Sequence, residues 1–481
     1  MVFDGPKVAD GYLGPFDGSQ SATQRVDPAP DSRDFFHHCR ELRRMFAAVR
    51  RTWMGRRSSP ETDPTPLIRS RHDTILAVQT DPRITARKGR VEFALTRRVG
   101  QLASHPPMSA PNPPSPTASQ RVQPRPDVVA MEGYHSPQVS VRVRLNTNES
   151  PFPPPAKWQQ QLAAEVSRID FHRYPDRAAW NLRVAIGEFH GVGPEWVFAA
   201  NGSNEVIQTV CLTYGGPGRT AAVFEPTYAM HRHIAQTSGA RIVDGVRGVD
   251  FSVSEAEVDR VIEEAHPEII FLCSPNNPTG GLAAPELVRH TLAATTGLVF
   301  VDEAYGQFAS WSAQSLLDDD SPIAVSRTYS KTWSMAGVRL GYLLAPPWMV
   351  AEFDKVVLPY HLDSLKQVAG TLALGYADDM AARVEQLVAQ RERVGAGLRS
   401  LAVDVWPSSA NFILFRPRAV DANLVWQRLV DNSVLVRNCS SWPGLAGCLR
   451  VTIGTADEND AFLDALEASL DGALVDSPEI P

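Results

Sequence analysis

Lys331 comes just after an apolar stretch, stands among hydroxyl-bearing residues, and is one of four lysines after residue 130. Most lysines lie on the surface. The amine of a lysine at a strand end can instead form a Schiff base with an aldehyde cofactor. Thr328, Ser330 and Arg339 are close to it in the sequence and could bind a phosphate group. The pattern indicates a candidate catalytic lysine beside an anion site.

Asp302 ends the apolar stretch 298–302, and Tyr305 follows three residues later. A carboxylate at the end of a buried strand needs a partner, because an isolated buried charge is costly. It could cap the next helix. It could also keep a pyridinium nitrogen protonated, so that a cofactor ring acts as an electron sink. Asp302 is therefore a second candidate for cofactor binding.

Three loops that follow apolar stretches carry further polar or aromatic candidates. The string SPNNPTG (274–280) contains Asn277, which could donate to a phenolate oxygen, although such strings often mark only turns. The string NGSNE (201–205) is a glycine loop that opens a helix, where free N–H groups bind phosphate. Tyr228, at the end of EPTY, could stack on a flat ring or lie in the core.

Short apolar stretches alternate with helical ones in the central part of the chain. This alternation predicts a mostly parallel sheet covered on both faces, with ligands bound at the carboxyl ends of the strands, where the candidates lie. A long helix at about 363–401 is expected to lead into a smaller α+β domain. The expected strands are 196–200, 220–225, 241–246, 268–273, 298–302, 323–329 and 339–345, then 403–406, 411–415 and 448–453; the expected helices are 205–214, 228–238, 254–265, 285–294, 421–432 and 457–469.

The composition excludes several classes of protein. The chain has 481 residues, of which 43% are hydrophobic and 21% charged, which is enough for two or three domains. It has no apolar stretch of the length that crosses a membrane and no secretory signal, so we expect a cytoplasmic protein without a membrane partner. Its five cysteines are far apart and form no CxxC pair, so neither a metal site nor a disulfide framework is predicted.

The net charge of −7 conceals two different compositions. Residues 1–130 hold 20 Lys and Arg against 13 Asp and Glu, with 16 of the 38 prolines, whereas the rest of the chain is strongly acidic. Residues 33–54 have the spacing of a basic amphipathic helix. A basic segment could bind a membrane surface, a partner or nucleic acid. We favour a disordered tail, or sequence upstream of a start at Met131, and expect no nucleic-acid partner.

The strings NGSNE, EPTY, SPNNPTG, DEAY and YSK followed by Arg339, in this order, resemble the fold-type I pyridoxal-phosphate enzymes of the aspartate aminotransferase superfamily. The resemblance extends from about residue 144 to 470. It implies an α/β fold with a mostly parallel central sheet, helices on both faces and a small α+β C-terminal domain. It also implies an N-terminal arm at 131–175, a large cofactor-binding domain at 176–360, and a linker helix with the small domain at 361–481.

Within this superfamily the chain resembles the histidinol-phosphate aminotransferase family. The similar segments are RLNTNESP (144–151), RYPD (173–176), ANFILFR (410–416), VR (436–437) and GCLRVTIG (447–454). Two positions depart from the family pattern: Ser150 replaces the usual asparagine, and Asn204 replaces an aspartate. Because backbone N–H groups bind the phosphate, we expect little effect from the change at Asn204.

The resemblance implies a role for each candidate at the cofactor, pyridoxal 5'-phosphate. Lys331 would form the Schiff base and then carry protons, Asp302 would pair with the ring nitrogen, and Tyr228 would stack on the ring. Tyr305 and Asn277 would bond the phenolate oxygen. The phosphate would be held by Gly202, Ser203, Asn204, Ser330 and Arg339, with Thr328 behind them and Tyr174 reaching in from the neighbouring subunit. The last role implies a homodimer with shared active sites.

The resemblance also implies a transamination between histidinol phosphate and 2-oxoglutarate, which gives imidazole-acetol phosphate and glutamate. Glutamate donates the amino group in the direction of histidine biosynthesis. Arginine forks bind carboxylate and phosphate equally well, so one pocket can take both substrates. We expect Arg450 to clamp the α-carboxylate of glutamate, Arg416 and Arg437 to hold the substrate phosphate or the glutamate side chain, and Asn148 to contact substrate.

Several other functions compete with this one. Inside the superfamily the rivals are an aromatic or broad-specificity aminotransferase and a threonine-phosphate decarboxylase of cobalamin synthesis. Outside it, the basic segment could be a DNA-binding module fused to an aminotransferase-like sensor, but it has no helix-turn-helix pattern. A catalytically inactive homologue is disfavoured, because Lys331, Asp302 and the other motif residues are present.

Overall fold

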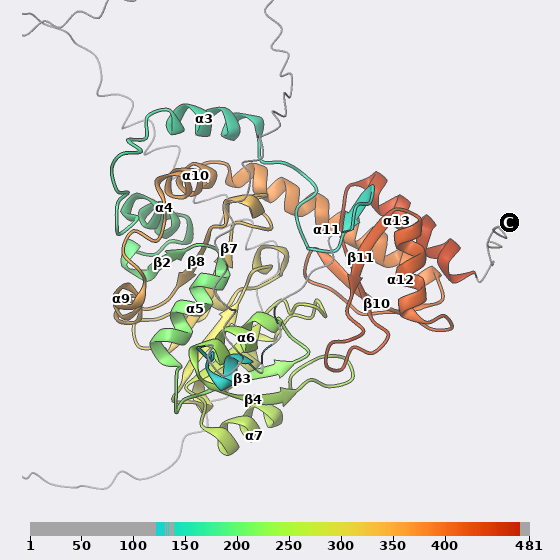
Figure 1. Ribbon diagram of the computed structural model, residues 1–481, viewed down its shortest axis with the longest axis horizontal. Helices are drawn as coiled ribbons and strands as arrows, with labels where there is room; N and C mark the ends of the chain where they lie inside the picture. Colours follow the sequence, from blue (N-terminus) through green and yellow to red (C-terminus); the bar gives the residue numbers. More distant parts are fainter. Residues whose placement is uncertain (1–121, 130, 132, 134–138, 472–481) are drawn as a thin grey trace, which may run out of the picture. The chain divides into compact units, whose positions relative to one another are not determined.

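The computed structural model describes residues 122–129, 131, 133 and 139–471 (Figure 1). The helix predicted at 33–54 and most of the basic segment therefore lie outside the described residues. The described residues closest to this segment include the short helix α2 (Pro126–Val129). Arg125, just before it, donates to the carbonyl of Thr237 at 3.0 Å, in helix α6 (Ala229–Ser238). This hydrogen bond links the segment before Met131 to α6.

A seven-stranded sheet in the order β2-β8-β7-β6-β5-β3-β4 forms the centre of the described fold (Figure 1). In this sheet only β8 runs in the opposite direction to the other strands, so the prediction of a mostly parallel sheet is confirmed. The predicted stretches follow the observed strands closely because buried parallel strands are almost continuously apolar. The strands are β2 (Val197–Ala200), β3 (Thr220–Glu225), β4 (Arg241–Val246), β5 (Ile269–Cys273), β6 (Leu298–Asp302), β7 (Ile323–Thr328) and β8 (Gly341–Leu344).

Helices cover both faces of this sheet, as the strand pattern predicts. Along β5, Phe271 packs in a cluster with α5, α6 and α9, whereas its neighbour Leu272 packs in another with α7 and α8. Helices α4 and α10 cover the edge formed by β2 and β8. The bounds are α3 (Ala156–Val166), α4 (Trp180–His190), α5 (Ser203–Tyr214), α7 (Glu255–Ala265), α8 (Pro285–Ala294), α9 (Pro347–Val356) and α10 (Ser364–Leu374), with 3-10 turns η2 (Pro194–Trp196), η3 (Gly306–Phe308), η4 (Ala313–Leu316) and η5 (Ala336–Val338).

A second, five-stranded sheet in the order β1-β11-β12-β10-β9 forms the smaller α+β part, and both sheets belong to one compact unit. The predicted helix at 363–401 is broken near Gly375, and α11 (Ala377–Ser400) carries the chain to the second sheet (Figure 1). Strand β1 (Val143–Leu145) pairs in parallel with β11 (Val434–Asn438), which ties the N-terminal arm to this sheet. The other elements are β9 (Val403–Val405), β10 (Phe412–Pro417), α12 (Ala422–Asp431), β12 (Leu449–Thr452) and α13 (Ala456–Leu470).

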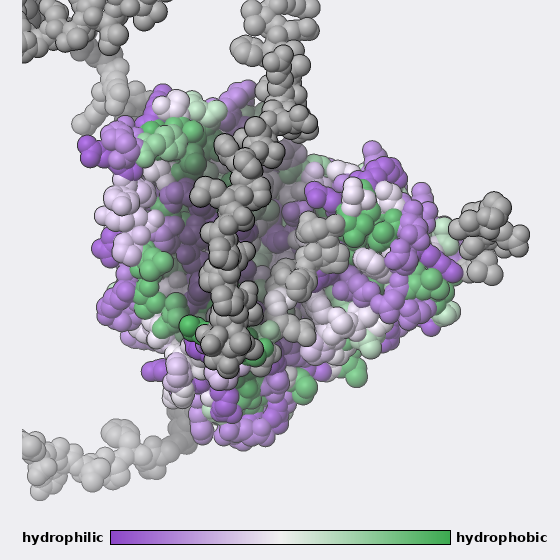
Figure 2. Space-filling view, viewed as in Figure 1, coloured by the Kyte–Doolittle hydropathy of each residue, from purple (hydrophilic) through white to green (hydrophobic). Residues whose placement is uncertain are grey.

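The visible surface mixes hydrophilic residues with small hydrophobic groups (Figure 2). Within residues 122–129, 131, 133 and 139–471, no helix is both long and apolar enough to cross a membrane.

Candidate active site

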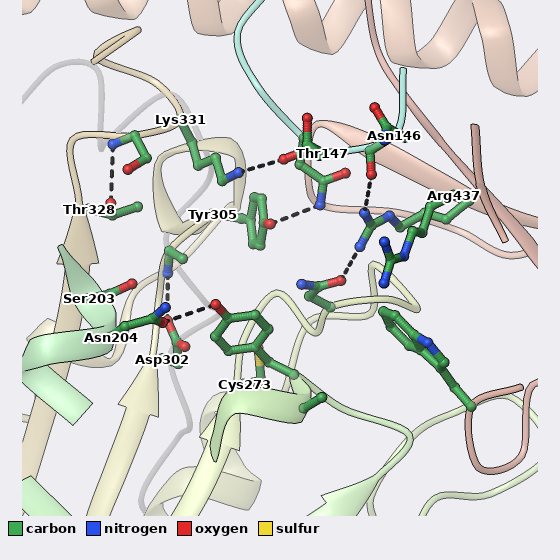
Figure 3. Close-up of a pocket in the computed structure, with 18 of the residues that line it drawn as sticks. Asn146, Thr147, Ser203, Asn204, Cys273, Asp302, Tyr305, Thr328, Lys331 and Arg437 are labelled. Carbon is green, nitrogen blue, oxygen red and sulfur yellow. Dashed lines mark hydrogen bonds between the residues drawn. The ribbon is translucent and has the colours of Figure 1, made fainter. Parts of the chain in front are cut away.

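A pocket lies at the carboxyl ends of the parallel strands, between the two sheets and the N-terminal arm (Figure 3). Most of the residues selected from the sequence line it, although they come from segments far apart in the chain. They are Asn148, Ser203, Asn204, Tyr228, Asn277, Asp302, Tyr305, Thr328, Ser330, Lys331, Arg339, Arg437 and Arg450. The arm also contributes Asn146 and Thr147, and the β11–β12 connection contributes Trp442.

Lys331 lies in the loop after β7, and its Nζ donates to the carbonyl oxygen of Thr147 at 3.0 Å (Figure 3). Its removal from water, followed by the positive charge of Arg450, lowers the pKa of the Lys331 amine to about 7. Burial disfavours the charged form of an amine, and nearby cations act in the same direction. The amine can therefore be neutral near physiological pH, as a nucleophile or a general base must be.

Asp302 ends β6 and is 2% exposed. One of its carboxylate oxygens lies 2.9 Å from Nε2 of the fully buried His231, and the other accepts from the N–H of Ala304 at 3.0 Å and the hydroxyl of Ser326 at 3.2 Å. Asp302 thus holds the following turn, as the capping interpretation expects, and also lines the pocket. A fixed, buried carboxylate of this kind can bind a protonated ring nitrogen.

His231 belongs to none of the sequence motifs and was not predicted as a site residue. The imidazole stacks on Phe271 with ring centroids 4.8 Å apart, and this contact fixes its plane. A helical signal was available, because His231 follows Tyr228 by three residues and such residues share one face of a helix. Tyr228 and Asp302 both line the pocket, so a polar residue on that face could have been suspected.

The loop at Gly202 has the geometry of a phosphate site. Gly202 has a φ of +80°, and α5 begins at the next residue. A β-carbon placed on Gly202 would lie 2.7 Å from Nη2 of Arg339, so only glycine lets the guanidinium approach the loop. Arg339 donates to the Ser330 hydroxyl at 3.2 Å. The helix terminus, the guanidinium and the hydroxyl form a donor set that fits a phosphate dianion.

The side chains of Thr328 and Asn204 hold neighbouring residues of this site in place. The Thr328 hydroxyl accepts from the N–H of Ser330 at 3.1 Å and so fixes the loop before Lys331. The side chain of Asn204 accepts from the Tyr228 hydroxyl at 3.0 Å (Figure 3). The amide at position 204 therefore helps to position Tyr228, a role that does not depend on the negative charge of an aspartate.

Asn277 and Tyr305 line the same part of the pocket. Arg450, which is 4% exposed, donates to Oδ1 of Asn277 and, at 2.9 Å, to the carbonyl of Asn146. The Tyr305 hydroxyl accepts from Nδ2 of Asn148 at 2.9 Å. Burial raises the pKa of the Tyr305 phenol to about 12, so Tyr305 stays a neutral hydrogen-bond donor.

The N-terminal arm closes the pocket through backbone carbonyls. Those of Asn146 and Thr147 accept from Arg450 and Lys331, as described above. The arm is fixed at Asn148, whose φ is +54° and whose N–H donates to the Thr452 hydroxyl at 3.0 Å. Every residue type has a backbone carbonyl, so these contacts could not have been predicted from the sequence.

Arg416 is not brought to the pocket, so its predicted substrate role finds no support in the structure. In the antiparallel pairing of β10 with β9, Arg416 lies directly opposite Asp404. The guanidinium pairs with that carboxylate at 2.8 Å, and its side chain is 47% exposed. The register between two strands decides where such an arginine points, and a single sequence does not reveal it.

Tyr174 also lies outside the pocket of its own chain. It is 80% exposed and stacks on Tyr360, with ring centroids 4.5 Å apart. Its predicted role requires a second subunit, so that role stays a prediction. Gly202 is not itself a lining residue, but it adjoins Ser203, which is.

Comparisons with known proteins agree with this geometry. The family model of the class I and II aminotransferases matches residues 141–466. A histidinol-phosphate aminotransferase of Frankia casuarinae is 43% identical over 71% of this chain and 89% of its own length. One of Streptomyces avermitilis is 44% identical over 69% of this chain and 92% of its own length.

Solved structures show the same fold. The histidinol-phosphate aminotransferase of Sinorhizobium meliloti, solved with pyridoxal-5'-phosphate, superposes with a TM-score of 0.68 at 21% identity, over 74% of this chain and 99% of that chain. The L-threonine-O-3-phosphate decarboxylase of Porphyromonas gingivalis has a TM-score of 0.60 at 19% identity, over 68% and 99%. At such identities the likeness concerns the fold alone.

Proposed function

This chain belongs to the class I and II aminotransferases and, within them, to the histidinol-phosphate aminotransferases, and on that premise we propose that it transfers an amino group between histidinol phosphate and 2-oxoglutarate. In the direction of histidine biosynthesis, glutamate would donate the amino group to imidazole-acetol phosphate. The observation that carries the proposal is the convergence on one pocket of Asp302 from the end of β6, Lys331 from the loop after β7 and Arg450 from β12.

The residues of the pocket fit pyridoxal 5'-phosphate as the cofactor. The helix α5 terminus with Ser203, Ser330 and Arg339 would hold the phosphate, and Asp302 would bind the ring nitrogen. Tyr228 would lie against the ring, while Asn277 and Tyr305 would bond the phenolate oxygen. When bound, the protonated ring supplies an electron sink that makes the proton at the substrate Cα easier to remove.

The side chains of the protein do the positioning and the proton transfer. Lys331, whose amine has its pKa lowered to about 7, can take a proton at Cα and return it on the other side of the reaction. His231 fixes the direction of the Asp302 carboxylate. Arg450 would bind the α-carboxylate of glutamate, and Arg437 a second anionic group, because guanidinium forks match carboxylate and phosphate alike.

The proposed working form is a homodimer in the cytoplasm. Several large apolar or aromatic side chains are exposed around α4 and before α10, as at a surface that a second copy could cover. They are Phe171, Tyr174, Trp180, Leu358 and Tyr360. The four cysteines within the described residues are free thiols, which agrees with a reducing compartment.

A panel of substrates tests the proposed reaction. The protein loaded with pyridoxal 5'-phosphate is incubated with 2-oxoglutarate and histidinol phosphate, phenylalanine or threonine phosphate in turn. We expect glutamate to form fastest with histidinol phosphate. Turnover of phenylalanine alone would indicate an aromatic aminotransferase, and release of CO2 from threonine phosphate would indicate the decarboxylase; either result would overturn the proposal.

A further inference from the structure

One aromatic ring in the pocket has no role in the proposed reaction. Trp442 lies between β11 and β12 and lines the pocket together with Arg437 and Arg450. Among the described residues that line it, the other two large aromatic side chains, Tyr228 and Tyr305, are assigned to the cofactor in the proposed function. Tyr228 donates to Asn204, and Tyr305 accepts from Asn148. Trp442 lines the same pocket and is assigned to neither the cofactor nor the arm.

The connection that carries Trp442 is held in a fixed shape. Successive backbone bonds run from the N–H of Trp442 to Cys439, from Leu445 to Trp442 and from Cys448 to Leu445, at 2.9, 3.1 and 2.9 Å. Cys439, Leu445 and Cys448 are fully buried in one cluster, and Trp442 packs against it. The indole is therefore placed by the fold and does not depend on a substrate to order it.

Trp442 lies beside an anion-binding side chain. The guanidinium of Arg437 is over the indole, 5.4 Å from the ring centroid. The same connection approaches the loop that carries Tyr228. A β-carbon on Gly444 would lie 3.5 Å from Cδ of Pro226, two residues before Tyr228. A cation thus lies over the indole, and both side chains line the pocket.

The contact between Arg437 and Trp442 bears on how one pocket can bind two different substrates. One pocket must accept glutamate, whose side chain ends in a carboxylate, and histidinol phosphate, whose side chain ends in an imidazole ring. An arginine holds the carboxylate. A flat heteroaromatic ring is stabilised by stacking on an indole, whereas a carboxylate gains nothing from that face.

We propose, on the basis of the proposed function, that the imidazole ring of histidinol phosphate stacks on Trp442. Trp442 is then the residue that determines the preference for the ring-bearing substrate. Arg437, beside it, serves the carboxylate of glutamate in the same side-chain subsite.

The test compares the two half-reactions of the full-length protein loaded with pyridoxal 5'-phosphate. In Trp442→Ala, the KM for histidinol phosphate is expected to rise about tenfold, the upper range for an aromatic contact. The KM for glutamate is expected to change by less than about twofold, since that substrate makes no stacking contact. Trp442→Phe retains a ring and is expected to lie near the wild type for both substrates.

Trp406→Ala is the matched control. Trp406 packs on the same buried cluster and also carries an arginine over its ring, Arg416 at 5.5 Å, but it does not line the pocket. The variant Trp406→Ala shows how the loss of an indole from this cluster affects the protein. Both KM values are expected to stay unchanged in it. If Trp442→Ala does not fold, Trp442→Leu keeps an apolar side chain without a ring and is expected to show the same selective rise.

Three outcomes would overturn the assignment. Equal increases in both KM values would mean that Trp442 only positions Arg437. Unchanged KM values in Trp442→Ala or Trp442→Leu, with a wild type that turns over histidinol phosphate, would refute the stacking role alone. A wild type that turns over glutamate but not histidinol phosphate would refute the proposed function, and the stacking role with it.

Discussion

The lowered pKa of Lys331 is the residue property with the clearest consequence. The amine ordinarily has a pKa of 10.5, and burial together with Arg450 brings it to about 7. Above that pH the amine is neutral and can attack an aldehyde. In cofactor-free protein, the rate of recombination with pyridoxal 5'-phosphate should rise as the pH increases through about 7 and then level off. Stopped-flow absorbance measures it.

Lys331→Ala is the control for that experiment, because it leaves only the background from other lysines, such as the exposed Lys157 and Lys355. A rate that continues to climb toward pH 10 in the wild type would mean that the amine keeps its ordinary pKa. That result would contradict the burial of Lys331 beside Arg450.

His231 should matter through Asp302. A hydrogen bond to a charged group typically contributes about 1.5–3 kcal/mol, so His231→Leu is expected to lower kcat roughly ten- to hundredfold with little change in KM. His231→Gln, which keeps a donor, should recover part of the loss. Steady-state kinetics of both variants checks this, and equal losses in the two would show that the bond to Asp302 is not the cause.

At the scale of elements, the geometry of the turn from β2 into α5 predicts how a substitution at Gly202 affects cofactor binding. In Gly202→Ala, the new methyl group would meet the Arg339 guanidinium at 2.7 Å, so affinity for pyridoxal 5'-phosphate should fall at least about tenfold. Gly191→Ala is the matched control: its φ is +72°, but nothing lies within 4 Å of the added carbon. It should lose stability without losing cofactor affinity, as titration and thermal unfolding would show.

The elements also show why some of the fold was predictable and some was not. Strands such as β5 and β6 are buried along their whole length, and continuous apolar runs reveal them. Strand β1 has three residues, with the exposed Arg144 in the middle, and β11 contains Arg437, so neither presents such a run. The arm and the second sheet are joined by pairings far apart in the chain, which local patterns do not show.

Site residues were predictable from the sequence where the side chain itself carries a group that the proposed chemistry requires. Asp302 ends a strand and Lys331 lies in the loop after the next one, and both bear groups that suit the cofactor, so motifs identified them. The contacts of His231 with Asp302 and of Trp442 with Arg437 exist only in the folded chain, so no local pattern identified these two residues. Arg416 is an arginine in a segment that resembles the family, but the register between β10 and β9 places it opposite Asp404.

At the scale of the whole molecule, the proposed dimer with shared sites predicts complementation. Tyr174→Ala should lower activity about tenfold through loss of a hydroxyl at the phosphate, and Lys331→Ala should abolish it. A mixed dimer has one site with an intact Lys331 and, from the other chain, an intact Tyr174. Activity should therefore reappear when the two variants exchange subunits. Failure to recover, with dimers demonstrated by light scattering, would mean that Tyr174 does not act across an interface.

The most direct test of the central claim is the stoichiometry of the reaction with histidinol phosphate and 2-oxoglutarate. We expect the wild type, but not Lys331→Ala, to form one glutamate for each imidazole-acetol phosphate. Formation of glutamate at the wild-type rate by Lys331→Ala, or no glutamate from histidinol phosphate in the wild type, would contradict the claim.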